Sequence, residues 1–451
     1  MTTMWSLRGF VEAIRQARSG RGERHPTDNR TPAGKTPAFG GVPDSRGNRA
    51  PTRVVIIGLA VLLVTAGCAG GVRSRDPNVV IELDHYTDAA ASRQFRAVLD
   101  RCARRFDLRI QRQDVPTDQL MPKVLRDATA HSLPDLLFVD NPDLQTVAET
   151  GALTELSQYG LSGEGHFSAI VEAGSYRGKL YGLAPGVNGL ALFYNRTMFE
   201  RAGLDPPETW QEMRAAARTL TRGSTHGLAF SAIASEEGSW QFEPFLWSNG
   251  GELDELTAPE SVRALEFWSG LVEDGLASRS VVNWNQNDVI DRFASGHAAM
   301  MINGSWSLSA LDESGTDYGV VPIPTPSPDV APQVPLGGEV GVVPETTPRR
   351  QENAARVLGC MLERENMLDW TTDHAYVPSR VDTAEQYARD VPAMKPFVTE
   401  VATGRARTAE LGPRYREVSQ ALADAVQATI AGSTSPEQAL ERAARVAETA
   451  D

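Results

Sequence analysis

The body of the chain alternates short apolar runs with longer amphipathic stretches, which restricts it to strands connected by helices. Asn78–Leu83 predicts a first strand, and Ala90–Arg105 predicts the following helix because its apolar residues recur at three-to-four spacing. Leu108–Gln113 predicts a second strand. Asp135–Asp140 (DLLFVD) is an apolar run between acids, as expected of a strand buried on both faces of a parallel sheet, and Leu144–Glu149 predicts the next helix. This order predicts an α/β fold.

Polar residues follow two of these predicted strands. Asp140, Asn141 and Asp143 stand at the end of the third strand, where ligands bind in open α/β sheets. The alternative is a plain turn, because Pro142 lies among them. Asp88 follows the first strand and either contacts a ligand hydroxyl or caps the next helix.

Charge divides the chain into two unlike parts. Residues 1–67 carry ten Lys and Arg against four Asp and Glu, a charge of +6. Since the net charge of the whole chain is −14, the other 384 residues carry −20. A body this acidic repels phosphate backbones, so we expect no nucleic-acid binding. Residues 19–53 hold almost nothing apolar that a core could bury, so we expect residues 1–53 to be a disordered extension and hypothesise that translation starts downstream of Met1.

Residues 54–67 predict a signal peptide. The uncharged run Val54–Thr65 is shorter than the about 20 residues of a spanning helix but matches a signal-peptide apolar region of about 7–15 residues. Small residues then precede Cys68, and VTAGC resembles a bacterial lipobox, although Thr65 stands where Leu is usual. We expect a lipidated Cys68, a linker over residues 68–76, and anchoring to the outer face of the cytoplasmic membrane. The alternative is an ordinary secretory signal with Cys68 incidental.

The remaining reactive residues indicate neither a metal site nor catalysis. Cys102 and Cys360 lie far apart in amphipathic stretches, and we expect two small buried thiols, with a disulfide as the alternative. The seven histidines share no HxxxH spacing, and no CxxC occurs, so we expect neither metal nor cofactor. No G-x-S-x-G, H-E-x-x-H or Walker motif occurs, so we expect no enzyme; a glycoside hydrolase remains the alternative because it needs only two carboxylates.

An ordered set of short motifs runs through the centre and end of the chain. The motifs are KLYGLAP (179–185), LALFYN (190–195), PETWQE (207–212), WSNGGE (247–252), FASGHAAMMINGSW (293–306), PLGGE (335–339) and YVPSR (376–380). In PETWQE, Thr209 and Glu212 predict a capping box, and residues 351–369 predict a helix. In this order the motifs resemble the extracellular solute-binding proteins of ABC importers, in the sugar-binding group that includes maltose-binding protein. The resemblance runs from about Asn78 to about Ala447.

The resemblance implies a two-lobe periplasmic-binding-protein-like fold whose lobes close on a ligand in the cleft. Lobe one takes residues 77–186 and 335–380, and lobe two takes residues 187–334 and 381–451. A ligand that touches both lobes is fully bound only in the closed form, so it shifts the population there. The resemblance also implies a monomer that captures a di- or oligosaccharide and delivers it to permease subunits, which, like the ATPase, are separate chains.

The resemblance and the chemistry of sugars together predict ligand contacts. Sugar rings expose C–H faces that pack on aromatic planes, and their hydroxyls need fixed polar partners. Trp306 matches a sugar-stacking Trp of the maltose-binding branch, with Asn303 and Gly304 beside it, and Gly304 lets the backbone approach the ligand. Trp240 matches a second aromatic contact, and Asn188 a polar contact where that branch has an acid. The alternatives are a core role for Trp306 and a surface role for Trp240.

Three further candidates rest on position. Glu339 lies where the chain re-enters lobe one, and Arg414 and Tyr415 precede the final helices and would close over the sugar. Since these candidates mix acids with one Arg, they favour a neutral polyol over an anion. A receptor for a glycerophosphodiester, a peptide or an amino sugar is the alternative within the binding class.

Overall fold

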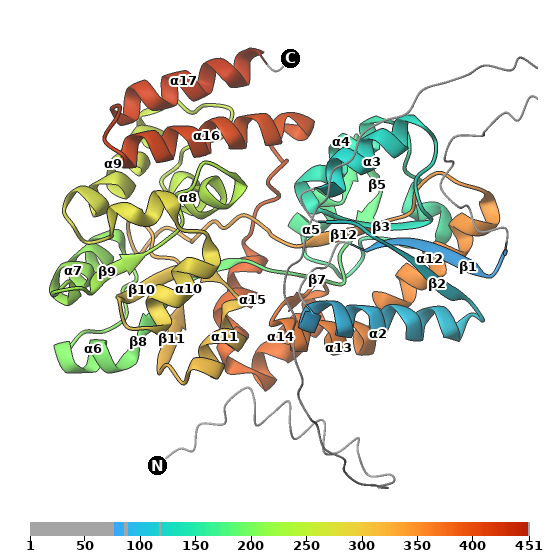
Figure 1. The fold of residues 1–451 in the computed structure, drawn as a ribbon, viewed down its shortest axis with the longest axis horizontal. Helices are drawn as coiled ribbons and strands as arrows, with labels where there is room; N and C mark the ends of the chain where they lie inside the picture. The colour runs from blue at the N-terminus through green and yellow to red at the C-terminus, as the bar shows by residue number, and fades with distance from the viewer. Residues whose placement is uncertain (1–75, 85–88, 117–118, 450–451) are drawn as a thin grey trace, which may run out of the picture. The chain divides into compact units, whose positions relative to one another are not determined.

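The structure, a computed structural model, describes residues 76–84, 89–116 and 119–449, and two sheets organise them (Figure 1). The predicted extension over residues 1–53, the signal peptide, Cys68 and Asp88 lie outside the described residues. Among the helices that are described, none is long and apolar enough to cross a membrane. The α/β class is confirmed.

The first sheet has five strands in the order β2-β1-β3-β12-β6. Its strands are β1 (Val79–Asp84), β2 (Arg109–Asp114), β3 (Leu136–Asp140), β12 (Glu339–Val342) and β6 (Gly182–Leu183). β1 runs parallel to β2 and β3, whereas β12 runs antiparallel to β3 and β6. β3 therefore has the expected parallel neighbour on one side, β1, and an antiparallel neighbour on the other, because β12 returns from the other sheet in the opposite direction.

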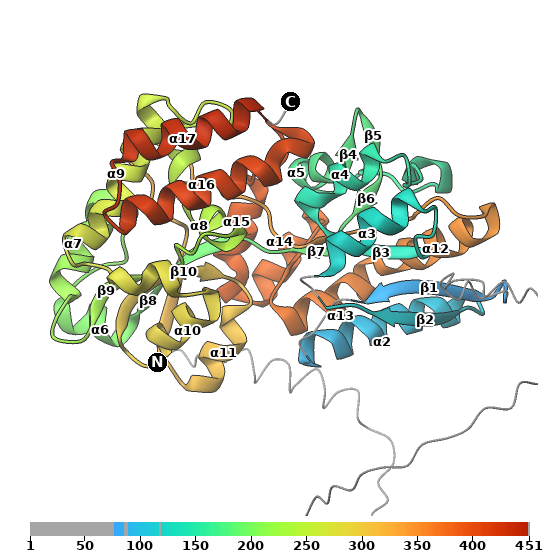
Figure 2. The ribbon, with the colours of Figure 1, turned by 45° about the horizontal axis from the view of Figure 1, so that its top comes forward.

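Helices cover both faces of this sheet (Figure 2). On one face lie α2 (Ala89–Arg105), α12 (Pro348–Met361) and α13 (Arg364–His374); on the other lie α3 (Leu120–Thr129), α4 (Leu144–Glu149) and α5 (Ser168–Ala173). The continuous apolar run in β3 follows from this arrangement, since Leu136, Leu137, Phe138 and Val139 are at most 1% exposed.

The second sheet has four strands in the order β11-β8-β10-β9. Its strands are β8 (Leu190–Asn195), β9 (His226–Ala229), β10 (Ala298–Gly304) and β11 (Tyr318–Val321). The helices around it are α6 (Arg196–Ala202), α7 (Trp210–Leu220), α8 (Glu236–Ser248), α9 (Pro259–Glu273), α10 (Gln286–Ala294), α11 (Ser307–Ser314), α15 (Lys395–Ala402), α16 (Tyr415–Ile430) and α17 (Pro436–Thr449). β8 is antiparallel to β10 and β11, and β9 is parallel to β10.

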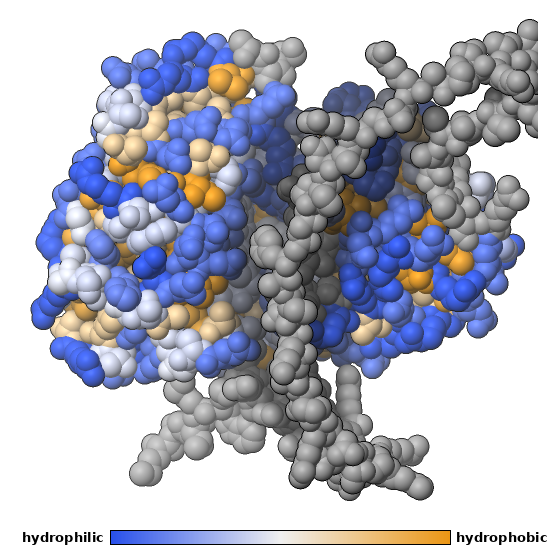
Figure 3. All heavy atoms as spheres, in the orientation of Figure 1, coloured by the Kyte–Doolittle hydropathy of each residue, from blue (hydrophilic) through white to orange (hydrophobic). Residues whose placement is uncertain are grey.

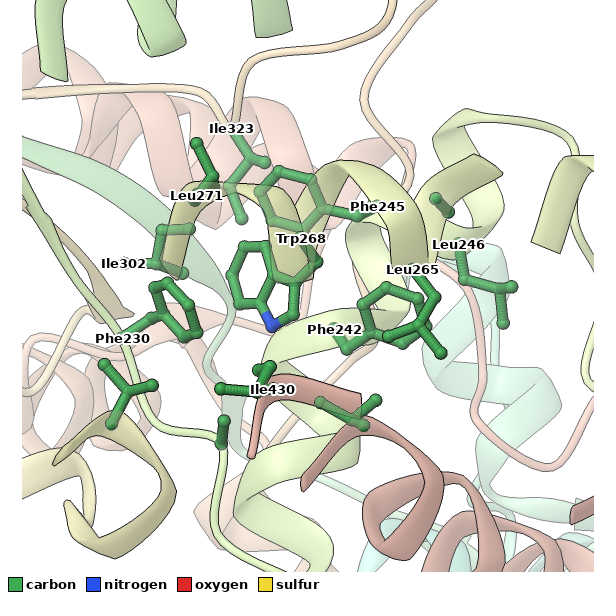
Figure 4. Close-up of a cluster of buried hydrophobic side chains, with 14 of the residues drawn as sticks. Phe230, Phe242, Phe245, Leu246, Leu265, Trp268, Leu271, Ile302, Ile323 and Ile430 are labelled. Atoms are coloured by element: carbon green, nitrogen blue, oxygen red, sulfur yellow. The ribbon is translucent and has the colours of Figure 1, made fainter. Parts of the chain in front are cut away.

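An aromatic cluster forms the core beside this second sheet (Figure 4). Trp268 of α9 is completely buried, and its ring centroid lies 4.0 Å from that of Phe230 and 4.3 Å from that of Phe245. Ile302 of β10 and Ile430 of α16 pack into the same cluster. The cluster holds α8 in place, and the first turn of α8 carries several residues of the site described below.

Short segments connect the two sheets and lie beside one another. β7 (Gly186–Val187), on the way from β6 to β8, pairs with β13 (Val377–Pro378). Residue 188 forms an isolated bridge with residue 337, which lies on the way from β11 back to β12, and residue 335 bridges to residue 405. The chain thus passes between the sheets at residues 184–189, 322–338 and 379–394. The predicted lobe boundaries stay a prediction.

Short elements complete the described chain. They are η2 (Asn141–Asp143), η3 (Leu156–Tyr159), β4 (Ser175–Tyr176), β5 (Lys179–Leu180), η4 (Arg279–Asn283), α14 (Val381–Asp390), η5 (Pro392–Met394) and η6 (Gly412–Arg414). β4 and β5 form a two-stranded hairpin.

The local sequence pattern predicts the start of one helix correctly and the extent of another helix wrongly. The capping box at α7 is confirmed: Thr209 Oγ1 accepts from the Glu212 amide at 3.3 Å, and the Glu212 carboxylate accepts from the Thr209 amide at 3.0 Å. The single helix expected over residues 351–369 is wrong, because α12 ends at Met361 and α13 begins at Arg364. Asn366 Nδ2 donates to the Cys360 carbonyl at 2.8 Å and so satisfies an end group of α12.

Cys102 of α2 and Cys360 of α12 form a disulfide, with their Cα atoms 5.6 Å apart. The expectation of two free thiols is therefore wrong. The two helices pack on the same face of the first sheet, and this tertiary contact brings together residues 258 positions apart in sequence. No local spacing reports such a pairing.

The described surface that Figure 3 shows is mainly hydrophilic, with smaller apolar areas between. Among described residues, Val446 is the one large apolar side chain classed as exposed, at 45%.

Candidate functional site

A cavity of about 310 Å³ lies where segments from both sheets meet, and we call it the first cavity. Its lining residues come from the ends of strands, from the first turn of α8 and from the connecting segments. They are Asp140, Asn188, Glu236, Glu237, Trp240, Gln286, Trp306, Gly337, Gly338, Glu339, Tyr376 and Arg407. Its volume is near the lower end of the range for small-molecule sites, and its position at the carboxyl end of β3 is where ligands bind in open α/β sheets.

Two indole rings form an aromatic wall in the first cavity. Trp240 and Trp306 are stacked, with ring centroids 5.7 Å apart and ring planes 17° apart. Gly304 makes this possible, because a Cβ at that position would lie 2.0 Å from the Trp306 ring. The glycine therefore makes room for the indole, whereas the sequence suggested that it lets the backbone approach a ligand.

Arg407 joins acids from the two sides of the cavity. Its guanidinium contacts Asp140 Oδ1 at 2.6 Å, at the end of β3, and Glu236 Oε1 at 2.7 Å, in the first turn of α8. The side chain is 3% exposed. Burial acts to lower the pKa of Arg407, but Asp140, Tyr415, Glu236 and Glu243 act to raise it, and the pKa lies well above its usual range. Arg407 is thus a permanent cation whose charge these acids already balance.

A layer of hydroxyl and carboxyl groups lies beneath Glu236. Tyr415 Oη is 2.7 Å from Glu236 Oε1 and 2.8 Å from Glu243 Oε1, and Ser419 donates to Glu236 Oε2 at 2.6 Å. Complete burial raises the pKa of Glu243 to about 8, so this carboxyl is mainly protonated at pH 7. It can then donate to Tyr415 while Tyr415 donates to Glu236. This chain of hydrogen bonds fixes the Glu236 carboxylate in the cavity wall.

Two glycines of the connecting segments stand where a larger side chain would not fit. A Cβ on Gly337 would lie 1.9 Å from Asn188 Oδ1, and Gly338 has a φ of +98°, which favours glycine. Asn141 Nδ2 donates to the carbonyls of Leu336 at 3.1 Å and Gly338 at 3.0 Å. Asn141 therefore attaches this segment to the end of β3, which positions Glu339 in the cavity.

The structure brings together five of the predicted ligand contacts and places the others elsewhere. The five that line the first cavity are Asp140, Asn188, Trp240, Trp306 and Glu339. Asn303 donates to the Gln286 carbonyl at 2.9 Å and accepts from the Gly304 amide, so it supports the Trp306 turn from outside the lining. Tyr415 is fully buried beneath the lining, and Arg414 donates to the Ala447 carbonyl of α17 at 3.1 Å.

Five further side chains line the cavity without having been predicted as contacts. They are Glu236, Glu237, Gln286, Tyr376 and Arg407. Glu236 and Glu237 had a local signal, since they stand at the start of the helix that carries Trp240, and acids favour helix N-termini. Arg407 had no local sequence signal, because its partner Asp140 is 267 positions away.

A second cavity of about 660 Å³ adjoins the first and shares Asp140 and Glu339 with it. Asp143 lines this second cavity and forms a two-point ion pair with Arg416, with Nε–Oδ1 and Nη2–Oδ2 distances of 2.7 Å each. Burial raises the pKa of Asp143, while Arg416 acts to lower it. Arg416 Nη2 also reaches Asp140 Oδ2 at 3.3 Å.

The described residues hold no group of three or more His, Cys, Asp or Glu side chains arranged to bind a metal ion. Two α/β lobes with an aromatic and acidic cavity at the ends of their strands define a protein that binds a small polar molecule. The profile of the bacterial extracellular solute-binding protein family matches residues 97–396, which is more than half of the chain, and the chain belongs to that family.

Known relatives share this architecture. A galactooligosaccharide-binding protein of Bacillus subtilis is 23% identical over 385 residues, covering 81% of this chain and 88% of the relative. The crystal structure of a cyclic α-maltosyl-1,6-maltose binding protein from Arthrobacter globiformis matches with a TM-score of 0.73 and 26% identity over 83% of this chain and 99% of that one. UgpB from Mycobacterium tuberculosis, in complex with glycerophosphocholine, matches with a TM-score of 0.71 and 20% identity over 82% and 98%, and so shares the fold.

Proposed function

We propose that this chain is the substrate-binding subunit of an ABC importer and that it captures a sugar, of two or more units, between its lobes. The single observation that carries the proposal is the first cavity, in which the Trp240–Trp306 wall stands beside carboxylates held in fixed directions. An aromatic plane packs against the C–H face of a sugar ring, and carboxylates accept hydrogen bonds from its hydroxyls.

The charge of the cavity favours an uncharged ligand over an anion. The lining holds four acids, Asp140, Glu236, Glu237 and Glu339, against one Arg. Arg407 is already engaged by Asp140 and Glu236, so a phosphate entering the cavity would meet excess negative charge without a cation available to pair with it. A sugar instead supplies hydroxyl donors to these carboxylates.

Relatives support this ligand class. The Bacillus subtilis and Arthrobacter globiformis proteins are named for the oligosaccharides that they bind. The glycerophosphocholine complex of the Mycobacterium tuberculosis protein shows that the same fold accommodates a glycerophosphodiester, which is therefore the second candidate to test. The relatives are named as binding proteins, which supports release of the ligand unchanged.

A hydrolase would need carboxylates placed for acid and base chemistry. Asp140 and Glu236 are both held by the Arg407 guanidinium, and Glu236 also accepts from Ser419. Both carboxylates are therefore already bonded to groups of the protein, whereas a general acid must present its proton to the leaving group of a substrate. This arrangement supports binding over hydrolysis.

Export of the chain follows from its family, and its attachment by a lipid on Cys68 remains our proposal from the sequence. The Cys102–Cys360 disulfide supports an oxidising location, because such bonds persist outside the cytoplasm. Mass spectrometry of the native protein tests the anchor, since the proposal predicts a mature chain that begins at an acylated Cys68. A chain cut elsewhere and free of lipid contradicts it.

Calorimetric titration tests the proposed ligand class. The purified protein is titrated with maltose, trehalose, cellobiose, lactose and glycerophosphocholine, and the ligand is recovered afterwards and analysed. We expect one sugar to bind with a Kd of roughly micromolar, about −8 kcal/mol, and to be recovered intact. Binding of glycerophosphocholine alone would favour the second candidate, a receptor for a glycerophosphodiester. Conversion of the sugar would show that the chain is an enzyme.

A matched pair of tryptophan variants tests the site itself. We expect Trp306→Ala to weaken sugar binding about 30-fold, because truncation of a buried aromatic anchor costs about 2 kcal/mol or more. Trp284→Ala is the control: that ring stacks with Arg292, at 5.2 Å from the guanidinium carbon to the ring centroid, and does not line the cavity. Equal effects of the two substitutions on sugar binding would contradict the assignment of Trp306 to the binding site.

A further inference from the structure

The second cavity adjoins the first, and two side chains belong to the walls of both. These side chains are Asp140 and Glu339, so a ligand of the first cavity that reaches past their carboxylates would lie against the wall of the second. The second cavity, at about 660 Å³, is larger than the first, at about 310 Å³. A ligand that fills only the first cavity therefore leaves the larger of these two adjoining cavities without contacts.

The two cavities differ in the surfaces that they offer. The first presents indole rings, whereas the second presents the aliphatic side chains of Leu120, Met121 and Leu125 from α3, and Pro413 from η6. Met121 and Leu125 are one helical turn apart, so they lie on the same face of α3, and both are partly exposed. No aromatic ring lines the described part of the second cavity, so it lacks the planar surface on which a sugar ring stacks.

Three of the five charged residues that line the second cavity are paired with one another, and the other two are Glu339 and Glu417. Arg416 holds Asp143 at two points and also reaches Asp140. The aliphatic side chains are then the part of the wall that gains most when water is displaced, since burial of apolar surface is favourable.

We propose that the second cavity takes an aliphatic substituent of the ligand, so that the preferred ligand is a glycoside whose sugar ring lies against Trp306 and whose apolar chain lies against Met121 and Leu125. This inference rests on the proposed function, because it needs the sugar end to occupy the first cavity. Asp140 and Glu339, at the junction, face the polar linkage between the two ends.

Paired glycosides test the inference. Once the calorimetric panel has found a sugar that binds, its methyl and hexyl glycosides are titrated into the purified protein. We expect the hexyl glycoside to bind at least about tenfold more tightly than the methyl glycoside, because its additional methylene groups are buried against α3. Equal affinities would overturn the inference while leaving the proposed function intact. Absence of binding by every sugar and every glycoside would overturn both.

Variants of α3 test whether this helix is the source of the higher affinity for the hexyl glycoside. Met121→Asn combined with Leu125→Asn should remove the preference for the hexyl glycoside and leave the affinity for the methyl glycoside unchanged, and the unchanged affinity shows that the variant is folded. Arg126→Asn, at an exposed position of the same helix, is the matched control and should keep the preference. If the preference survives the double substitution, or if an unsubstituted trisaccharide gains as much as the hexyl glycoside in both proteins, the second cavity does not take an aliphatic group.

Discussion

Replacement of Arg407 by methionine removes the cation that joins the two sides of the first cavity. Methionine keeps much of the length of the side chain but supplies no donor to Asp140 or Glu236, whose carboxylates accept from Arg407 at 2.6 and 2.7 Å. The variant therefore leaves two acids close together and also removes a cation that acts to lower the pKa of the buried Glu243. We expect a large loss of stability from this one substitution.

The size of the loss follows from the burial of the partners. Breaking a buried ion pair by removal of one partner costs about 3–5 kcal/mol. Arg407 is 3% exposed, but the Asp140 and Glu236 side chains are 36% and 24% exposed, so water partly solvates the acids left behind. We therefore expect a decrease of about 3 kcal/mol in the free energy of unfolding, at the lower end of that range.

Urea unfolding at pH 7, followed by circular dichroism, measures this decrease. Arg349→Met is the control, because Arg349 is exposed and makes a single 3.4 Å contact with Asn78, so its replacement should change the unfolding free energy by less than about 0.5 kcal/mol. If Arg407→Met costs no more than the control, the ion pairs between the two sides do not stabilise this arrangement and the reasoning fails.

Three further predictions concern the disulfide, a buried acid and a glycine. Joint replacement of Cys102 and Cys360 by alanine should lower the free energy of unfolding by about 2–5 kcal/mol, because the bond closes a loop with a sequence separation of 258; equal urea midpoints for the two proteins would refute this. Glu243 has a folded pKa of about 8, above its unfolded value, so its contribution to stability is full below about pH 4.5 and falls as the pH rises towards 8. The unfolding free energy of the protein relative to Glu243→Gln should fall over that window, and a difference independent of pH would contradict the assignment. Gly304→Ala should weaken sugar binding in calorimetry about as much as Trp306→Ala does, since its Cβ would displace the ring, and unchanged binding would show that the ring position is not needed.

Much of the fold could be predicted because its signals are local. The apolar run before Asp140 predicts β3 within one residue, since a strand buried on both faces must be apolar throughout. The capping box at Thr209 depends on atoms three residues apart and needs no tertiary information. The break between α12 and α13 was missed because it depends on the contact between Asn366 and Cys360, which no helical periodicity reports.

The aromatic part of the site could be predicted, because a tryptophan at a recognisable position has a recognisable role in ligand binding. Trp306 follows a strand and a glycine, and the structure places its ring against Trp240 in the first cavity. Arg407 was missed, and the disulfide was only the alternative to free thiols. The residues that pair are 267 and 258 positions apart, and a pattern within one segment contains no information on such contacts. Among the arginines near the end of the chain, the sequence alone also could not separate Arg414 from Arg407.

A crystal structure of the purified protein with the sugar that binds in calorimetry tests the central claim most directly. The account predicts an intact sugar in the first cavity, with one ring packed against Trp306 and hydroxyls donating to the carboxylates of Asp140 and Glu339. A sugar bound elsewhere on the chain, or a cleaved product in the cavity, would contradict the account.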